Sequence, residues 1–248
     1  MRLHRLPGIH HDSSCIIVSG SEATCIVDPG TTWYQANLVE RLKPYILDRS
    51  PLTSILLTHR HYDSCGAAPY LAEEYNAIIR IHSEGIPSLS GGDMFTTWAN
   101  RYGSDMPIID AEGMVEGEII SLGDVSLQVI HTPGHTSDSC SFFIPEKKAI
   151  ICGDLIPAAG HPVRADMPTG VLTELQESLV KVMDLKPEMI ICGRDEAIIG
   201  SELCYAVVSK HMHSVETRIE NKGMLPTDWP KPAETCHWLT PSPAWDFD

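Results

Sequence analysis

The sequence is poor in positive charge and has no long apolar run. Its 248 residues include 18 Lys and Arg against 33 Asp and Glu, a formal net charge of −15. Binding to nucleic-acid phosphates and to anionic lipid surfaces depends on clustered Lys and Arg, so this balance argues against both kinds of partner. No apolar stretch reaches the roughly 20 residues that a membrane-spanning helix needs. We therefore expect a small-molecule substrate, with no nucleic acid and no membrane as partner.

Paired cysteines are also absent. The eight cysteines occur singly, without a C-x-x-C pair, and the first residues lack the apolar core of a secretory signal. Because disulfides belong to oxidising compartments, we expect reduced cysteines and a cytoplasmic protein.

Length and composition predict one domain over residues 1–223. Residues 224–248 are rich in proline and tryptophan and are expected to form an extended strap on the surface. This tail either packs on its own domain or joins copies of the chain into a homo-oligomer.

Apolar periodicity predicts alternating strands and helices, which is typical of a layered α/β fold. The predicted strands cover residues 14–19, 23–28, 54–58, 77–82, 117–122, 125–131, 140–144, 148–152 and 189–192. The predicted helices cover residues 34–47, 67–75, 169–185 and 196–220. Residues 83–113 are interrupted by glycine and proline, and a long irregular segment of this kind predicts a lid or a substrate-binding loop.

Histidine is abundant, with 12 residues against 4 Phe. His59, His61 and Asp63 alternate directly after a predicted strand, and alternate residues of an extended segment share a face. His135 follows another strand in a Pro-Gly turn, and Asp154 follows a glycine at the end of a third. Three histidines with an open position for water are typical of catalytic zinc. Turn and cap chemistry is the alternative interpretation of the two aspartates.

The order of these motifs resembles the metallo-β-lactamase superfamily of metal-dependent hydrolases. The motifs are Thr-His-Arg-His-Tyr-Asp-Ser at 58–64, His-Thr-Pro-Gly-His-Thr at 131–136 and Gly-Asp-Leu at 153–155. The resemblance extends over roughly residues 13–220. It implies an α/β fold, an αββα four-layer sandwich of two mixed β-sheets flanked by helices, with a metal site along one edge. It also implies a first metal site of His59, His61 and His135, with Asp154 as bridging or fourth ligand.

Two positions depart from the family pattern. Ser64 and Arg194 stand where the family usually has histidines of a second metal site, which leaves that site with Asp63 and Asp154. The permanently charged guanidinium of Arg194 can fork across carboxylates and take the place of the second ion, although a surface salt bridge is an alternative. We therefore expect one ion rather than two, with zinc as the first choice and iron or manganese as alternatives.

The predicted activity is hydrolysis of a small ester, thioester, lactone or phosphoester by a metal-bound hydroxide. Asp63 would orient or deprotonate the water, while Arg194 and His161 would stabilise the oxyanion or protonate the leaving group. Two other functions stay open. One is a mononuclear iron oxygenase resembling the superfamily's sulfur dioxygenases, and the other is a degenerate, non-catalytic binding member.

Overall fold

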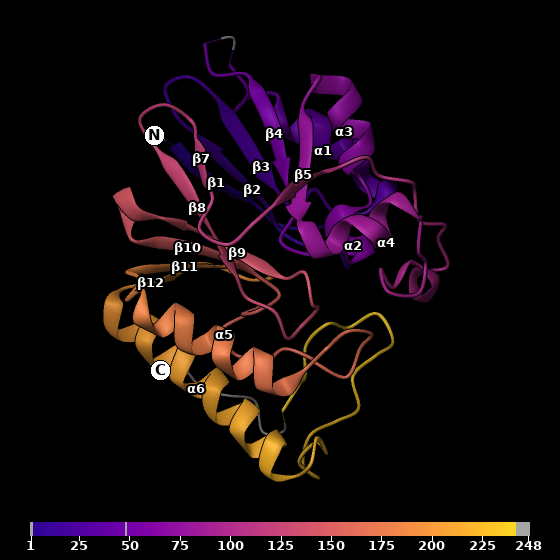
Figure 1. Ribbon diagram of the computed structural model, residues 1–248, viewed down its shortest axis with the longest axis vertical. Coiled ribbons are helices and arrows are strands. Elements are labelled where there is room, and N and C mark those ends of the chain that lie inside the picture. The colour runs from indigo at the N-terminus through magenta and orange to yellow at the C-terminus, as the bar shows by residue number, and fades with distance from the viewer. Residues whose placement is uncertain (1, 48, 242–248) are drawn as a thin grey trace.

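Two six-stranded sheets form the centre of the molecule (Figure 1). The computed structural model of the chain describes residues 2–47 and 49–241. The first sheet contains, in spatial order, β1 (Arg2–Leu6), β2 (Cys15–Ser19), β3 (Thr24–Val27), β4 (Leu52–Leu56), β5 (Ile78–His82) and β6 (Glu112–Met114). Strands β1 to β3 pair antiparallel and β3 to β6 pair parallel, so this sheet is mixed.

The second sheet is mixed as well. Its strands are β12 (Ile198–Ile199), β11 (Met189–Cys192), β10 (Ala149–Gly153), β9 (Cys140–Ile144), β8 (Ser126–His131) and β7 (Ile119–Ser121). Only the β10–β11 pair within it is parallel. The carboxyl ends of β10 and β11 therefore meet at one edge of the sheet, and Asp154 and Arg194 follow them there.

Helices cover the outer face of each sheet. Helices α1 (Gln35–Leu42) and α3 (Ala68–Tyr75) pack on the first sheet, and α5 (Leu172–Asp184) and α6 (Ser201–Glu220) pack on the second. Strand β2 shows the layering, because Ile16 and Val18 face the second sheet while Ile17 joins the core beneath the helices. The predicted αββα four-layer sandwich is confirmed. In the part of the chain that the structure describes, no helix combines the length and apolar character needed to cross a membrane.

Some local predictions are wrong. Asp63 does not lie in an extended segment, because the chain forms a one-turn helix, α2 (Tyr62–Cys65), with His61 as its N-cap. An acidic residue in a first helical turn is favourable because it faces the positive end of the helix dipole. Helix α5 begins at Leu172 rather than at residue 169, since Thr169 has a φ of 67° and cannot continue a right-handed helix. Strands β1, β6 and β12 were not predicted.

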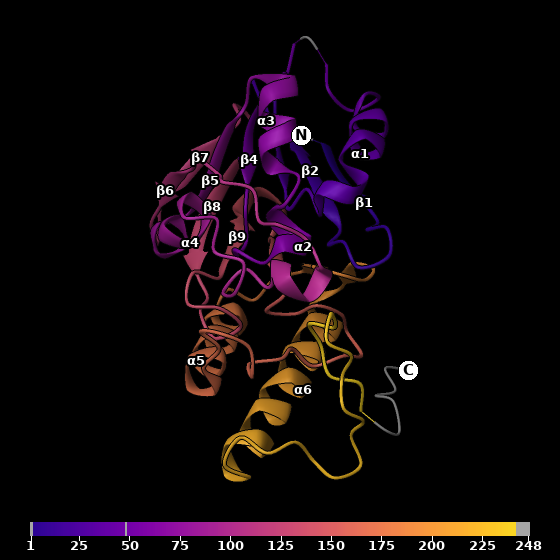
Figure 2. The same cartoon turned by 90° about the vertical axis from the view of Figure 1, so that its right-hand side faces the viewer.

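The two segments outside the regular layers lie near the same end of the sandwich. Residues 83–113 contain η2 (Ser83–Gly85), α4 (Ile86–Ser90) and η3 (Ala99–Tyr102). After α6 the chain turns back and runs without regular structure toward the sheets (Figure 2). Trp245 of the predicted tail lies outside the described residues.

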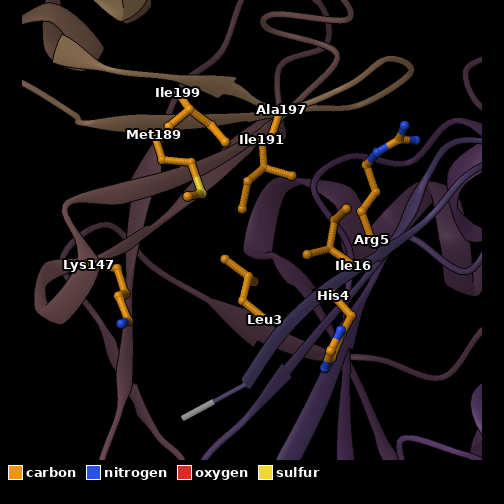
Figure 3. A pocket seen from close by; sticks show the side chains of 9 residues that line it. All are labelled: Leu3, His4, Arg5, Ile16, Lys147, Met189, Ile191, Ala197 and Ile199. Carbon is orange, nitrogen blue, oxygen red and sulfur yellow. The ribbon is translucent and has the colours of Figure 1, made fainter.

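An apolar groove of about 380 Å³ opens between the sheets at their edge strands β1 and β12 (Figure 3). Leu3 and Ile16 line it from the first sheet, and Met189, Ile191 and Ile199 line it from the second. None of the predicted site residues lines this groove, so it does not serve the predicted metal site.

Candidate metal centre

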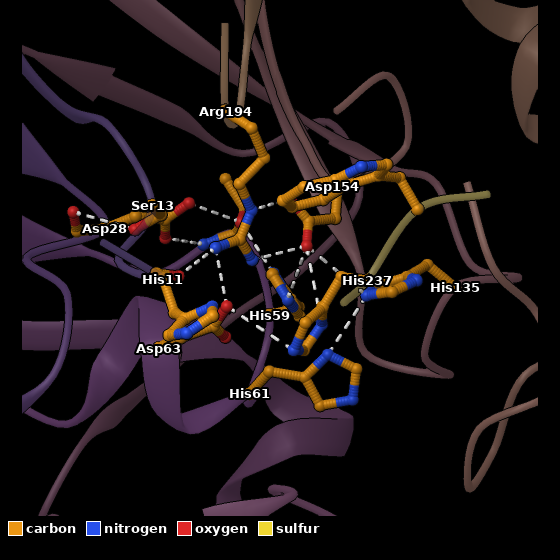
Figure 4. Close-up of polar contacts among 12 residues, drawn as sticks. His11, Ser13, Asp28, His59, His61, Asp63, His135, Asp154, Arg194 and His237 are labelled. Atoms are coloured by element: carbon orange, nitrogen blue, oxygen red, sulfur yellow. Dashed lines mark hydrogen bonds and ion pairs between the residues drawn. The ribbon is translucent and has the colours of Figure 1, made fainter. Parts of the chain in front are cut away.

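Four imidazoles form a buried cluster at the edge where the two sheets end. His59 and His61 lie in the loop after β4, His135 lies in the turn after β8, and His237 comes from the C-terminal tail. One nitrogen from each ring lies within 4.8 Å of the others, and each residue is at most 1% exposed. Figure 4 shows these rings gathered beside Asp154 and Arg194.

The orientation of His59 is set by a neighbouring hydroxyl. Thr58 donates its backbone N–H and its hydroxyl to the Asp28 carboxylate, at 2.8 and 2.6 Å. Because that hydroxyl proton is engaged, Thr58 Oγ1 accepts from Nδ1 of His59, 2.9 Å away. Nε2 of His59 is then unprotonated and has no hydrogen-bond partner among the described residues. Its lone pair is available to a metal ion.

A backbone carbonyl sets the tautomer of His135. Nδ1 of His135 donates to the carbonyl oxygen of Arg164 at 2.9 Å, which leaves Nε2 unprotonated. That Nε2 lies 3.0 Å from Nδ1 of His61. Two ring nitrogens this close need a proton or a cation between them. Nε2 of His61 has no partner in the described part of the chain.

His237 was not among the predicted site residues. It lies in the Pro/Trp-rich tail, beyond every motif, and the histidine surplus was the one sequence feature that could have drawn attention to it. Its Nδ1 lies 3.6 Å from Oδ2 of Asp154 and has no hydrogen-bond partner among residues 2–47 and 49–241. The expectation of a surface strap is wrong for His237 and Leu239, which are 0% and 1% exposed.

Arg194 lies between the two predicted carboxylates. Its Nε and Nη2 donate to Oδ1 and Oδ2 of Asp154 at 2.9 and 2.6 Å, and its Nη1 lies 2.5 Å from Oδ2 of Asp63. Burial alone would raise the pKa of Asp154, but the guanidinium holds it well below its usual range. Arg194 therefore forms a buried ion pair with both aspartates and does not form a surface salt bridge.

The structure thus brings six of the seven predicted site residues together: His59, His61, Asp63, His135, Asp154 and Arg194. The seventh, His161, is half-buried and pairs by a β-bridge with Ala158. Its ring centroid lies 6.3 Å from that of Trp238. Among the described residues, no hydrogen bond or ion pair joins His161 to the cluster.

The residues present fit a transition-metal ion. Unpaired buried ring nitrogens are costly unless something binds them. Burial lowers the pKa of His59 to about 3 and that of His61 well below its ordinary value, so these rings are neutral, as metal ligands must be. Oδ2 of Asp154 lies 3.8 and 3.6 Å from Nε2 of His59 and His135. Two ligand atoms that are each about 2.0–2.1 Å from a tetrahedral ion lie roughly 3.3 Å from one another. These side chains therefore need to move only slightly to bind one ion.

The irregular segment 83–113 supplies side chains beside the cluster. The Trp98 ring lies 5.1 Å from the ring of His237, and the Arg164 guanidinium lies 4.9 Å above the Trp98 ring. The Tyr102 hydroxyl lies 2.9 Å from Nε2 of His237. The segment predicted as a lid or substrate loop is therefore in contact with the candidate metal centre.

A second group of possible ligands, His82, Glu84 and His131, is less suited to an ion. The rings of His82 and His131 stack with centroids 3.9 Å apart and planes 8° from parallel. Lone pairs in parallel planes do not converge on one point, so both rings cannot bind a single ion without rotating.

Comparisons with known proteins identify the family and the fold of the chain. Residues 9–194 match the model of the "Metallo-beta-lactamase superfamily". The "Hydroxyacylglutathione hydrolase GloC" of Haemophilus influenzae is 30% identical over 198 residues, covering 77% of this chain and 89% of that protein. The B3 metallo-beta-lactamase BLEG-1 superposes with a TM-score of 0.70 at 20% identity, over 86% of this chain and 97% of the other. The structure of TTHA1623 "in a di-iron-bound form" superposes with a TM-score of 0.67 at 25% identity, over 81% of this chain and 96% of the other.

Proposed function

The chain belongs to the metallo-beta-lactamase superfamily, and we propose that it is a metal-dependent hydrolase with one ion held by His59, His61 and His135. The observation that carries this proposal is the buried set of imidazoles, in which His59 and His61 each have a ring nitrogen without a hydrogen-bond partner among the described residues. Asp154, whose Oδ2 lies within 3.8 Å of two of them, is the proposed carboxylate ligand. Zinc bound there would lower the pKa of a water ligand toward 7 and polarise a substrate carbonyl.

We propose a single ion because a fixed positive charge already lies between the second-site carboxylates. Arg194 contacts both Asp63 and Asp154, and all three side chains are almost fully buried. A second divalent cation between these two aspartates would have to displace the guanidinium or lie against it. At an effective dielectric of about 20, charges of +1 and +2 at 4 Å repel by roughly 8 kcal/mol.

The protein's own groups can do the remaining work of hydrolysis. Oδ1 of Asp63 has no hydrogen-bond partner in the described part of the chain, so it can orient a water or accept its proton. Arg194 keeps Asp154 ionised by its charge. The burial of the cluster excludes bulk water and strengthens each of these interactions.

Among the four predicted substrate classes we propose a thioester. The similar protein from Haemophilus influenzae is described as a hydroxyacylglutathione hydrolase, and an acyl group on the thiol of glutathione is a thioester. The test is a panel of acyl thioesters, esters, lactones and phosphodiesters, with released thiol measured by a chromogenic disulfide. Thioester turnover that chelation abolishes and zinc restores is expected. No turnover of any thioester would overturn the substrate class.

Iron is the second candidate, and one comparison favours it. A structure 25% identical to this chain is described as di-iron-bound, and histidine with carboxylate ligands also suits Fe(II). The discriminating measurement is metal analysis of protein purified without added metal, followed by oxygen uptake on a thiol or persulfide. Iron with oxygen uptake would replace the hydrolase proposal by an oxygenase, and absence of tightly bound metal would favour a non-catalytic member.

We also propose a cytoplasmic location and a small-molecule substrate. The location is supported by the cysteines, all eight of which are free thiols, as expected in a reducing compartment.

A further inference from the structure

We propose that His237, supplied by the C-terminal tail, is a fourth imidazole ligand of the metal centre and that the tail thereby closes over the ion. The proposal rests on the metal centre proposed above but does not depend on hydrolysis. Residue 237 lies outside the region that matches the superfamily model, residues 9–194. The proposed ligand is therefore a feature of this chain's tail.

Hydrogen bonds at Tyr102 determine which nitrogen of His237 is free. The Tyr102 hydroxyl has one proton and donates it to the carbonyl oxygen of Thr235 at 3.2 Å. Nε2 of His237 lies 2.9 Å from the same oxygen and 3.4 Å from Oδ2 of Asp63, and since both oxygens can accept, this nitrogen is assigned the ring proton. Nδ1 is left with a lone pair and no partner among the described residues. A ring nitrogen that donates outward while the other faces the ion is the usual arrangement of a metal-bound histidine.

Nδ1 of His237 faces the other proposed ligands. It lies 3.6 Å from Oδ2 of Asp154, the same separation that Nε2 of His135 has from that oxygen. The ring centroid of His237 is 4.7 Å from that of His61 and 5.7 Å from that of His135. His237 therefore occupies a place equivalent to that of the predicted ligands.

The tail is attached through a residue that also orients a predicted ligand. Arg164 donates its backbone N–H to the carbonyl oxygen of His237 at 3.1 Å, while its own carbonyl accepts from His135. Its side chain donates to the carbonyl oxygens of Cys236 and Ala233 at 2.7 and 3.3 Å. A further backbone bond joins Leu239 N–H to the Pro162 carbonyl at 2.7 Å. The positions of His135 and His237 are thus coupled through one backbone segment.

A fourth histidine has a consequence for access. Catalytic zinc sites keep one position open for water. With three histidines and Asp154 already bound to the ion, His237 would be a fifth protein ligand and would occupy that position. With His237 in place the imidazoles are at most 1% exposed. The tail must therefore lift from the centre to admit a substrate, and metal binding should hold it down.

The experiment compares wild type with His237→Gln and His237→Ala, using His213→Gln on the exposed side of α6 as the matched control. Cobalt(II) is the probe, with affinity measured by chelator competition and coordination by visible absorption. Loss of an outer partner of a metal ligand costs about 10–100-fold in affinity, and loss of a ligand should cost at least tenfold. We expect this loss of affinity and an altered cobalt spectrum in both His237 variants. Added imidazole should partly restore the cobalt affinity of His237→Ala. The control variant should match wild type.

Limited proteolysis of the tail gives a second readout. Cobalt should protect the tail of wild type and of His213→Gln, but not that of the His237 variants; circular dichroism of the metal-free proteins checks that each variant folds. Affinities within twofold of wild type, an unchanged spectrum and equal protection would overturn the role of His237 while leaving the metal centre intact. Absence of cobalt binding by wild type would overturn the metal centre itself, and with it this proposal.

Discussion

Replacing Arg194 by alanine should destabilise the protein by roughly 3–5 kcal/mol, the usual cost of removing one partner from a buried ion pair. Arg194 makes a two-pronged contact with Asp154, contacts Asp63, and donates to the carbonyl oxygen of His11 at 2.8 Å. Its loss leaves two carboxylates, at most 1% exposed, without their counter-ion. Urea unfolding in the presence of a chelator measures the effect.

The matched control is Arg101→Ala. Arg101 pairs with Glu234 at 3.6 Å, and the two side chains are 45% and 79% exposed. Exposed pairs contribute about 0–1 kcal/mol, so this variant should unfold close to wild type. A loss below 1 kcal/mol for Arg194→Ala, equal to that of the control, would refute the reasoning that Arg194 is a buried counter-ion.

The same variant tests the single-ion proposal. Without the guanidinium, Asp63 and Asp154 offer an oxygen-rich position that suits a hard ion such as Mn²⁺. Elemental analysis after equilibration with excess Mn²⁺ should give one ion per chain for wild type and two for Arg194→Ala. Two tightly bound ions in wild type would contradict the proposal.

Three further predictions follow from single contacts. Asp63→Asn should lower kcat by about 10²–10⁴-fold with metal content unchanged, and an unaltered kcat would remove Asp63 from the reaction. Thr58→Val removes the hydroxyl that orients His59, so zinc affinity measured by chelator competition should fall about 10–100-fold; an unchanged affinity would contradict that role. Burial lowers the pKa of His211 to about 4. As pH falls from 6.5 toward 4, the unfolded chain therefore binds a proton at this residue before the folded chain does. The free energy of unfolding should fall over that range by up to about 3 kcal/mol. Urea midpoints at pH 7 and pH 5 should therefore differ less for His211→Gln than for wild type, and equal differences would show that His211 does not contribute.

Local patterns in the sequence were sufficient to predict most of the sandwich. Strands such as β2 and β10 are continuous apolar runs, because both faces of each sheet are covered. The elements that were missed are short or weakly patterned. Helix α2 is a single turn, too short to show helical periodicity. Strands β6 and β12 have three and two residues, and β1 mixes arginine and histidine with leucine.

The candidate site was predictable only where its residues follow strands. His59, His61 and His135 are recognisable because each stands in a short motif at a strand end. Arg194 was recognised through a departure from such a motif. His237 has no motif, and it reaches the cluster through contacts with Arg164 and Tyr102 that are distant in sequence. A residue placed by tertiary contacts alone leaves no local pattern to find.

The place of His237 outside the regular layers also bears on how a metal ion could leave the centre. The three predicted histidine ligands follow strands of the two sheets, whereas His237 lies after α6 in a segment without regular structure. Segments with few regular contacts open locally at a lower free energy than the sheets unfold. Under the proposal above, opening of the tail alone would free one imidazole, so the tail would set the rate of metal loss as well as the access of substrate.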